Sequence, residues 1–147
     1  MKIKLGKSEL IHFVGIGGIG MSGLALIMNE LGFKIQGSDI TNNKNIERLK
    51  KNKINILIGH KKQNIKQSTI IVISSAIKKN NPELIDAKKR KIPIYKRGDM
   101  LAQVVSLMRN VVIAGSHGKT TTTTLTSNIF ISAKIDPTII NGGVLNS

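Results

Sequence analysis

Short apolar runs recur along the first two thirds of this chain, separated by polar and glycine-rich segments. Runs of this length, rich in Ile and Val, are typical of strands inside a sheet. The first run scarcely alternates between apolar and polar positions, which predicts a strand buried on both faces. The predicted strands are Leu10–Val14, Lys34–Gly37 ending at Ser38-Asp39, Ile54–Ile58, Thr69–Ile73 and Pro93–Tyr95.

Segments with helical spacing lie between these runs. Gly32 follows the first of them as a C-cap, and Pro82 stands in the first turn of the third. The predicted helices are 21–31, 45–51, 83–91 and 100–108. Strands that alternate with helices predict an α/β fold with a Rossmann-like, doubly wound parallel sheet, which we assign to a first domain of residues 1–108.

A second unit is predicted over residues 109–147. Its elements would be a strand at Val111–Ala114, a glycine-rich loop, a helix over Lys119–Ile131 and a strand at Pro137–Ile140. These elements are the opening of a second α/β domain, of the P-loop kind, and they cannot cover a sheet of their own. We therefore expect an incomplete second domain and a truncated chain.

Composition narrows the class of protein. The 147 residues are 40% hydrophobic and include no Cys, which excludes disulfides and thiolate sites and suits the cytoplasm. The uncharged stretch Leu10–Met28 is long enough for a membrane helix, but five glycines interrupt it, so we expect neither a membrane span nor a signal peptide.

The net charge of +15 suggests nucleic acid or another anionic partner. The lysines are spread over predicted helices and loops, and there is one Tyr and no Trp to stack on bases. We therefore expect no nucleic-acid partner and no membrane partner.

The turn after the first strand carries a dinucleotide fingerprint. Gly15, Gly17 and Gly20 allow a tight turn, a close approach of the backbone to a pyrophosphate, and packing of helix on strand. Asp39 ends the second strand about 20 residues later, where a carboxylate accepts hydrogen bonds from ribose hydroxyls. The motif predicts a nucleotide diphosphate but does not separate NAD, FAD and a UDP-sugar.

A second phosphate loop follows Val111–Ala114. Its residues are Gly115-Ser116-His117-Gly118-Lys119-Thr120-Thr121. Free N–H groups at the start of a helix, the Lys119 ammonium and a Thr120 hydroxyl suited to Mg²⁺ predict a nucleoside triphosphate site. The loop is shorter than the usual P-loop, because Ile113 stands where that motif has its first Gly.

Two histidines and an Arg-Gly-Asp tripeptide are considered as further candidates for a site. His12 lies in a buried strand and is expected to be structural, whereas His60, after the third strand, is a better candidate for contact with a ligand. Arg97-Gly98-Asp99 is interpreted as a helix start rather than as an integrin-type motif.

Taken together, these motifs resemble the Mur ligases over nearly the whole chain, and the shortened phosphate loop is that family's own form. Ser116 stands where the family has Thr, and Asp99 where Glu is common. Within the family, the pattern favours the member that adds L-alanine over the one that reattaches recycled tripeptide. The motifs are Gly15–Gly23, Gly37–Asp39, Ser74–Ile77, Asn81–Glu83, Gly115–Thr121 and Asn141–Gly143.

The resemblance implies two ligands. UDP-N-acetylmuramate would lie on the first domain, and ATP with Mg²⁺ on the second, where Lys119 and Thr120 would be catalytic and Thr120 would bind the metal. The substrate carboxylate would take the γ-phosphoryl group, and L-alanine would attack the acyl phosphate. The ATP-binding residues would be those of Gly115–Thr121, and the UDP-substrate residues would be Gly15, Gly17, Gly18, Gly20, Asp39, Ser74 and Ser75.

Alternatives remain open at this point. A Rossmann oxidoreductase would leave the Gly118-Lys119-Thr120 loop without a role, and a non-catalytic UDP-sugar-binding module would use only the first site. The resemblance places the L-alanine site beyond residue 147, so we expect this chain to be inactive by itself. The sequence leaves the oligomeric state open.

Overall fold

The computed structural model describes residues 5–141 and 144–146, which form a five-stranded sheet and a two-stranded hairpin. The large sheet has the strand order β3-β2-β1-β4-β5, and all its neighbouring strands are parallel. This order confirms the Rossmann-like sheet that the pattern predicts. Its strands are β1 (Leu10–Val14), β2 (Lys34–Asp39), β3 (Asn55–Ile58), β4 (Ile70–Ile73) and β5 (Ile94–Lys96).

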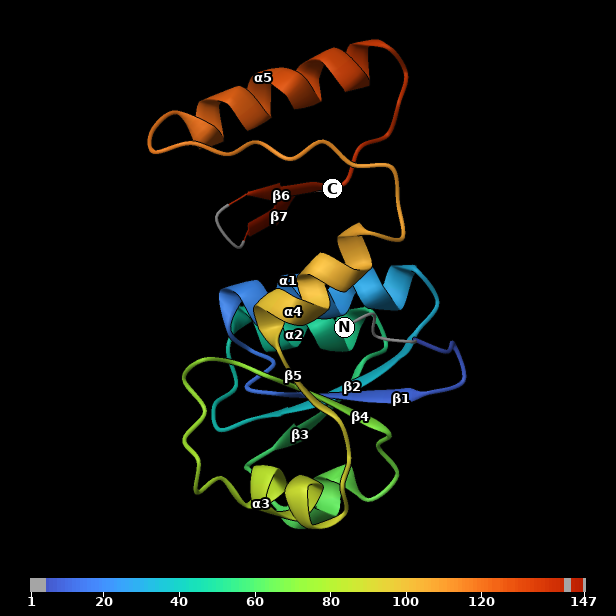
Figure 1. Cartoon of the computed structure of the whole chain (residues 1–147), viewed down its shortest axis with the longest axis vertical. Helices are drawn as coiled ribbons and strands as arrows, with labels where there is room; N and C mark the ends of the chain where they lie inside the picture. Colours follow the sequence, from blue (N-terminus) through green and yellow to red (C-terminus); the bar gives the residue numbers. More distant parts are fainter. Residues whose placement is uncertain (1–4, 142–143, 147) are drawn as a thin grey trace.

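Helices cover both faces of this sheet, as Figure 1 shows. Three of them, α1, α2 and α4, lie on one face, and α3 lies on the other, where it packs against the short 3-10 helix η1. The bounds are α1 (Ile19–Glu30), α2 (Lys44–Lys51), η1 (Lys62–Ile65), α3 (Pro82–Lys89) and α4 (Arg97–Val105).

The central strand β1 is buried on both faces, as expected. Because successive side chains point to opposite faces, Ile11 and Phe13 join the core under α1, whereas Val14 joins a smaller core with Ile71 and Ala87 under α3. Between them, His12 also points to the α3 face and is fully buried. A polar side chain at the centre of the sheet requires partners, which are described below.

Two short, lysine-rich helices begin at asparagine caps. The Asn43 side chain accepts a hydrogen bond from the Ile46 N–H at 3.0 Å and starts α2. The Asn81 side chain accepts from the Glu83 N–H at 2.9 Å, and Pro82 occupies the first turn of α3. These caps satisfy N–H groups in the first turn of each helix and so mark where each helix begins.

The remaining elements form a second unit beyond α4. It contains α5 (Lys119–Ser132) and an antiparallel hairpin of β6 (Ile139–Asn141) and β7 (Val144–Asn146). The hairpin contacts α1 through β7, while α5 lies farther from the large sheet (Figure 1). Of the sequence motif at the β6 end, Gly142 and Gly143 lie outside the described residues.

The strand predicted over Val111–Ala114 is not formed, so that prediction was wrong. These residues have no regular structure, and Val111 and Val112 are 62% and 75% exposed. An apolar run becomes a strand only when a neighbouring strand takes its hydrogen bonds, and here it has no such neighbour. Val111–Ala114 therefore has the composition of a strand but pairs with no other strand among the described residues.

The uncharged stretch over residues 10–28 is divided between β1, the glycine turn and α1. In the part of the chain that the structure describes, no helix is long and apolar enough to cross a membrane.

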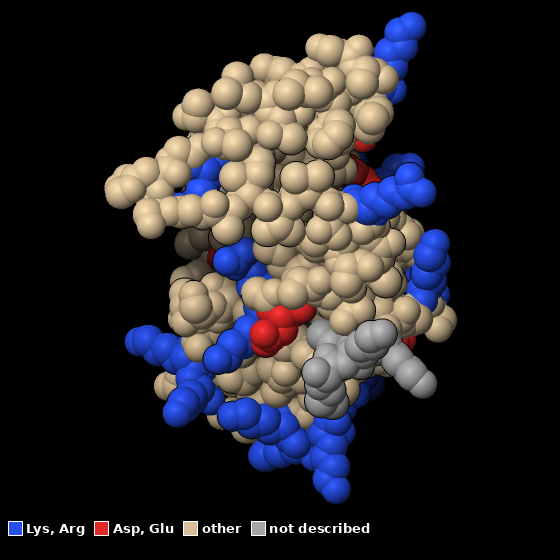
Figure 2. Space-filling model, turned by 45° about the horizontal axis from the view of Figure 1, so that its top comes forward, with Lys and Arg blue, Asp and Glu red and all other residues tan. Residues whose placement is uncertain are grey.

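Positive charge is distributed widely over the surface. Figure 2 shows Lys and Arg side chains at several separate places on the visible face, most of them around the lower half, while the upper part carries few. The chain has 23 Lys and Arg against 8 Asp and Glu. The charge is therefore spread over this face and does not form one continuous groove.

Gly37 is where β2 passes closest to the glycine turn. A Cβ atom at this residue would lie 2.5 Å from Ile16 Cδ1 and 2.7 Å from the Phe13 carbonyl oxygen. We expect Gly37→Ala to lower the free energy of unfolding by about 1–3 kcal/mol, because neither backbone nor a buried Ile can yield cheaply. Urea denaturation measures the change.

The matched control is Gly98→Ala in α4, where a Cβ would meet no atom within 4 Å. Alanine favours helix over glycine, so this variant should be unchanged or more stable by up to about 1 kcal/mol. Equal losses in the two variants would contradict the packing explanation.

Candidate functional site

The glycine turn lies at the carboxyl end of β1, where the strand order reverses. β1 has β2 on one side and β4 on the other, and ligands of open α/β sheets bind in the crevice outside the strands at such a reversal. The N–H groups of Gly15 and Ile16 both donate to the Ser38 carbonyl, at 2.8 and 3.0 Å. Gly15 has a φ of +80°, which a residue with a side chain seldom adopts.

Asp39 stabilises the glycine turn through a hydrogen bond to Gly17. Its Oδ2 accepts a hydrogen bond from the Gly17 N–H at 2.8 Å, and its Oδ1 accepts from the Thr41 N–H at 3.2 Å. The carboxylate is 9% exposed, and a Cβ at Gly17 would lie 2.9 Å from Oδ2. Asp39 is thus beside the turn, as predicted, and each of its oxygens accepts a hydrogen bond from a backbone N–H group. Contact with a ribose stays a prediction.

The start of α2 holds the other side of the turn. The side-chain amides of Asn45 and Asn43 donate to the Gly17 carbonyl, at 2.8 and 3.3 Å. Neither asparagine is among the site residues that the sequence predicts. Asparagines at the start of a predicted helix signal a cap, and nothing in their spacing indicates contact with Gly17, which is 26 and 28 residues away.

The N-terminus of α1 is open toward the crevice. Gly18 is its N-cap and offers no side-chain acceptor, and the first turn contains no acidic residue. Within the described residues, the N–H groups of Ile19, Gly20 and Met21 have no backbone acceptor outside the helix. The positive end of the helix dipole and these N–H groups suit an anion such as a phosphate.

Ser74 and Ser75 bound the crevice on the β4 side. The Ser74 N–H donates to the Val14 carbonyl at 3.3 Å, and its hydroxyl accepts from the Ala76 N–H at 3.2 Å. Ser74 is half-buried and Ser75 is exposed. The structure therefore brings the glycine turn, Asp39 and Ser74 to one edge of the sheet.

A buried polar network lies next to this edge, on the α3 face, around Glu83. Its Oε2 accepts a hydrogen bond from the Ser38 hydroxyl at 2.7 Å and lies 3.1 Å from His60 Nδ1. Its Oε1 accepts from the Asn64 amide at 2.5 Å. His12 Nε2 lies 3.6 Å from Oε2. Both Glu83 and His12 are fully buried.

Burial by itself raises the pKa of the Glu83 carboxyl, but the interaction with His12 and the hydrogen bonds from Ser38 and Asn64 outweigh it. The net effect holds the pKa below its ordinary value of 4.5. Glu83 is thus an ionised group that joins α3 to the middle of β1, through His12, and to the end of β2, through Ser38. The expectation that His12 is structural agrees with its place in this network.

The second phosphate loop precedes α5. Gly118 has a φ of +73° and is the N-cap, and the Lys119 ammonium donates to the carbonyls of Gly115 and Ser116. The Thr123 and Thr124 hydroxyls donate back to helix carbonyls, whereas the Thr120 hydroxyl has no hydrogen bond within the described residues. The loop is exposed throughout, and the Lys119 side chain turns back to the carbonyls of this same loop.

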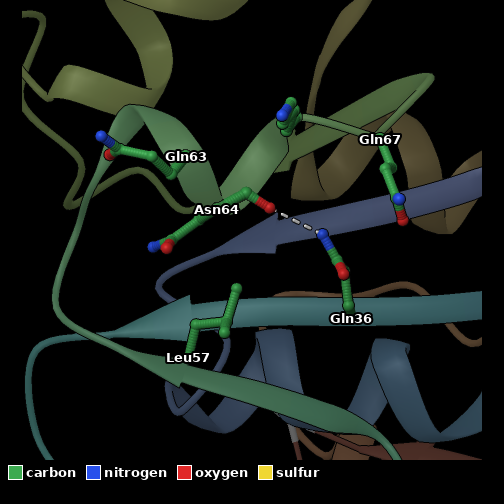
Figure 3. Close-up of a pocket in the computed structure, with 6 residues that line it drawn as sticks. Gln36, Leu57, Gln63, Asn64 and Gln67 are labelled. Carbon is green, nitrogen blue, oxygen red and sulfur yellow. Dashed lines mark hydrogen bonds between the residues drawn. The ribbon is translucent and has the colours of Figure 1, made fainter.

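A pocket lies apart from both glycine loops, between β2, β3 and η1. Figure 3 shows this pocket of about 410 Å³, with the Gln36 amide donating to the Asn64 carbonyl at 2.8 Å. None of the predicted site residues lines it. Among the described residues, no group of three His, Cys, Asp or Glu side chains could hold a metal ion.

Glu83→Gln tests the network. At neutral pH we expect this variant to unfold with a free energy about 1–3 kcal/mol lower, because a buried charge-assisted set of hydrogen bonds is lost. The folded-state pKa of Glu83 lies below 4.5, so its stabilisation is complete above pH 4.5 and is lost as the pH falls through the folded-state pKa. The difference between the two proteins should therefore shrink in acid.

Urea unfolding between about pH 3 and pH 7 measures this difference. Glu30→Gln, an exposed carboxylate at the end of α1, is the control and should differ little from wild type at any pH. A Glu83→Gln deficit that stays constant down to pH 3 would mean that the ionised carboxylate is not what the network stabilises.

Comparison with known proteins places these features in one family. Residues 10–109 match the model of the Mur ligase family, catalytic domain. The chain is 69% identical to a UDP-N-acetylmuramate–L-alanine ligase of Pelagibacter ubique and 51% identical to one of Bartonella bacilliformis. Both matches cover 100% of this chain and 32% and 31% of the relatives, so the chain spans about a third of the length of these curated relatives.

Solved structures agree with this relationship. The UDP-N-acetylmuramate-alanine ligase of Thermotoga maritima matches 91% of this chain with a TM-score of 0.80 and 32% identity, over 32% of its own length. A UDP-N-acetylmuramate:L-alanyl-gamma-D-glutamyl-meso-diaminopimelate ligase of Neisseria meningitides matches 92%, with a TM-score of 0.81 and 28% identity, over 43% of its length. With a family model matched across most of its residues, this chain belongs to the Mur ligase family.

Proposed function

We propose that this chain supplies the UDP-sugar-binding domain, residues 1–108, and the start of the ATP-binding domain, residues 109–147, of a ligase. The ligase joins L-alanine to UDP-N-acetylmuramate, with ATP and Mg²⁺, in the synthesis of peptidoglycan precursors. The observation that supports this proposal is the presence in one chain of two glycine turns that each open a helix, at Gly15–Gly20 and Gly115–Thr121. A ligase of this kind needs both, because it binds a UDP-sugar and a nucleoside triphosphate.

The glycine turn is suited to the diphosphate of the UDP-sugar. Gly17 and Gly18 keep the backbone free of side chains, and the α1 N-terminus presents free N–H groups. Asp39 at the end of β2 lies on the ribose side, and Ser74 and Ser75 at the end of β4 lie on the side of the sugar. His60, held at Nδ1 by Glu83, borders the same edge.

The loop before α5 is suited to MgATP. Its N–H groups at the helix start favour an anion, and Lys119 carries a charge that can leave the carbonyls of Gly115 and Ser116 for a phosphate oxygen. The Thr120 hydroxyl, without a partner in the described residues, is available to Mg²⁺. His117 is exposed at the tip of the loop.

The proposed chemistry transfers the γ-phosphoryl group of ATP to the carboxylate of UDP-N-acetylmuramate. The amine of L-alanine then attacks the acyl phosphate, forms the amide and releases phosphate. In this chain, Lys119 and Thr120 stabilise charge on the transferring group, and the glycine turn holds the other end of the acceptor in position. Residues for L-alanine are expected beyond residue 147, and the cytoplasm is the expected location.

The ligase that adds recycled tripeptide is the second candidate. The fold does not separate the two, because the structures named for each activity give TM-scores of 0.80 and 0.81. The relatives at 69% and 51% identity are both named for L-alanine, which favours that substrate. A non-catalytic UDP-sugar-binding module would leave the Gly118-Lys119-Thr120 loop without a role.

Calorimetry with UDP-N-acetylmuramate tests the first site. We expect the chain to bind the UDP-sugar and not NAD, and Asp39→Ala to lose most of the affinity. Because Asp39 also holds the Gly17 N–H, Asp39→Asn separates the two roles, since its amide oxygen can still accept from Gly17 but its charge is gone. Binding of NAD instead of the UDP-sugar would overturn the proposal.

A chimera tests the second site. This chain would replace the matching third of the Pelagibacter ubique relative, and ADP release would be measured with UDP-N-acetylmuramate and L-alanine. We expect activity in the chimera and a loss of at least about 100-fold in kcat with Lys119→Ala, because a charge on the transferring phosphoryl group is removed. Lys134→Ala, at the other end of α5, is the control and should keep full activity.

A further inference from the structure

Six lysines from two separate segments of the sequence lie on the α3 face of the sheet. Three belong to η1 and the residues beside it, and three belong to the C-terminal end of α3 and the residues after it, and these two elements pack together. All six side chains are exposed. They form a surface that we call the α3–η1 patch, made of Lys61, Lys62, Lys66, Lys88, Lys89 and Lys91.

Hydrogen bonds hold the two lysine-bearing elements side by side. Arg90, at the end of α3, donates through Nη1 to the Ile65 carbonyl and through Nη2 to the Lys66 carbonyl, both at 2.9 Å. The Asn64 amide of η1 donates to Glu83 Oε1 of α3. The fold therefore keeps two like-charged segments together although their lysines repel one another.

The acidic residues of this region do not neutralise the patch. Residues 59–92 include nine Lys and Arg but only two acidic residues, so they carry +7 of the net charge of +15. Glu83 is fully buried in its own network, and Asp86 pairs with Arg90 at 3.6 Å. Among the described residues, none of the six lysines forms an ion pair. The patch is therefore an uncompensated positive surface, which fits an anionic partner.

Two features decide which anionic partner fits best. Residues 59–92 contain no Phe, Tyr or Trp, so the bases of a single-stranded nucleic acid would have no ring to stack on. Ile85 is 42% exposed and precedes Lys88 and Lys89 by three and four residues, which places it on the same face of α3. An exposed apolar side chain beside lysines suits the boundary between lipid headgroups and acyl chains, whereas a hydrated phosphate backbone offers it no apolar contact.

The position of the patch leaves the rest of the molecule free. In Figure 1, α3 lies at one end of the long axis, and α5 lies at the other end. The glycine turn opens α1, which covers the opposite face of the sheet from α3. A flat surface can therefore contact the patch without covering α5 or the start of α1.

We propose that the α3–η1 patch binds the surface of a bilayer that contains anionic phospholipids. The lysines lie at the headgroup phosphates, and Ile85 enters the interfacial layer. Read along the sequence, the spread of these lysines predicts no such partner, because only the packing of η1 on α3 brings them together. Each lysine near such a surface changes the affinity about 5-fold, so six give reversible, salt-dependent binding. This inference goes beyond the proposed function and does not depend on it.

Sedimentation of the chain with phosphatidylcholine vesicles, with and without phosphatidylglycerol, provides the test. We expect binding only when phosphatidylglycerol is present. Raising NaCl from about 0.1 M to about 1 M should release the chain, because the Debye length falls from about 10 Å to about 3 Å. The triple variant Lys66→Gln/Lys88→Gln/Lys89→Gln should bind at least about 10-fold more weakly. Ile85→Gln should bind about 3-fold to 10-fold more weakly, because its apolar contact is lost.

Two matched controls accompany these variants. Lys44→Gln/Lys50→Gln/Lys51→Gln removes the same charge from exposed positions of α2, on the opposite face of the sheet. Ile129→Gln replaces an isoleucine of α5 that is 68% exposed. Both controls should bind the vesicles within about 2-fold of wild type, because neither touches the patch. Thermal unfolding shows that every variant is folded.

Other results would overturn the inference in separate ways. Equal losses in the two lysine triples would mean that net charge, and not the patch, attracts the bilayer. A loss with Ile129→Gln but not with Ile85→Gln would place the contact at α5. Binding of duplex DNA through the patch lysines, without binding of the vesicles, would make nucleic acid the partner. Titration of the same variants with UDP-N-acetylmuramate, expected to be unchanged, keeps any of these failures separate from the proposed function.

Discussion

The hydrogen bond from the Gly17 N–H to the Asp39 carboxylate fixes the geometry on which the site depends. It joins the turn after β1 to the end of β2, and the two N–H bonds to the Ser38 carbonyl reinforce it. Because the turn cannot move away from β2, the N-terminus of α1 stays at the crevice between β1 and β4. One acidic side chain thus fixes where the positive end of the α1 dipole lies at the crevice.

Glu83 positions α3 on the opposite face of the sheet by accepting hydrogen bonds, as Asp39 positions the glycine turn. An ionised carboxylate is costly to bury, and here the Ser38 hydroxyl and the Asn64 amide donate hydrogen bonds to it. His12 and His60 lie 3.6 and 3.1 Å from the same carboxylate. The network holds α3 against the same carboxyl edge and orients His60 by its Nδ1. Both faces of the crevice are therefore positioned by a carboxylate that accepts several hydrogen bonds, and not by apolar packing alone.

The two glycine turns that precede helices differ in how they are packed. The first lies against the sheet, where a Cβ atom added at Gly15, Gly17 or Gly20 would lie within 3.2 Å of a side chain. These side chains are Ile77, Asp39 and Arg97, of which Asp39 is buried and the other two are half-buried. The second is exposed, its preceding apolar run is not a strand, and its lysine folds over its own loop. The same local pattern, a glycine turn before a helix, is closely packed in one case because it lies at the edge of a sheet, and exposed in the other because no sheet adjoins it.

The sequence by itself determined the order of strands and helices, the parallel sheet, and the two glycine turns, because periodicity and glycine spacing are local properties. It could not show that Val111–Ala114 has no regular structure, since a strand forms only where a neighbouring strand takes its hydrogen bonds. Nor could it show that the two Asp39 oxygens accept hydrogen bonds from the N–H groups of Gly17 and Thr41. The buried place of Glu83 and the approach of Arg97 to Gly20 depend on segments that are distant in the chain. Only the tertiary structure decided these, because burial and contact between charges are set by how the strands are ordered in space.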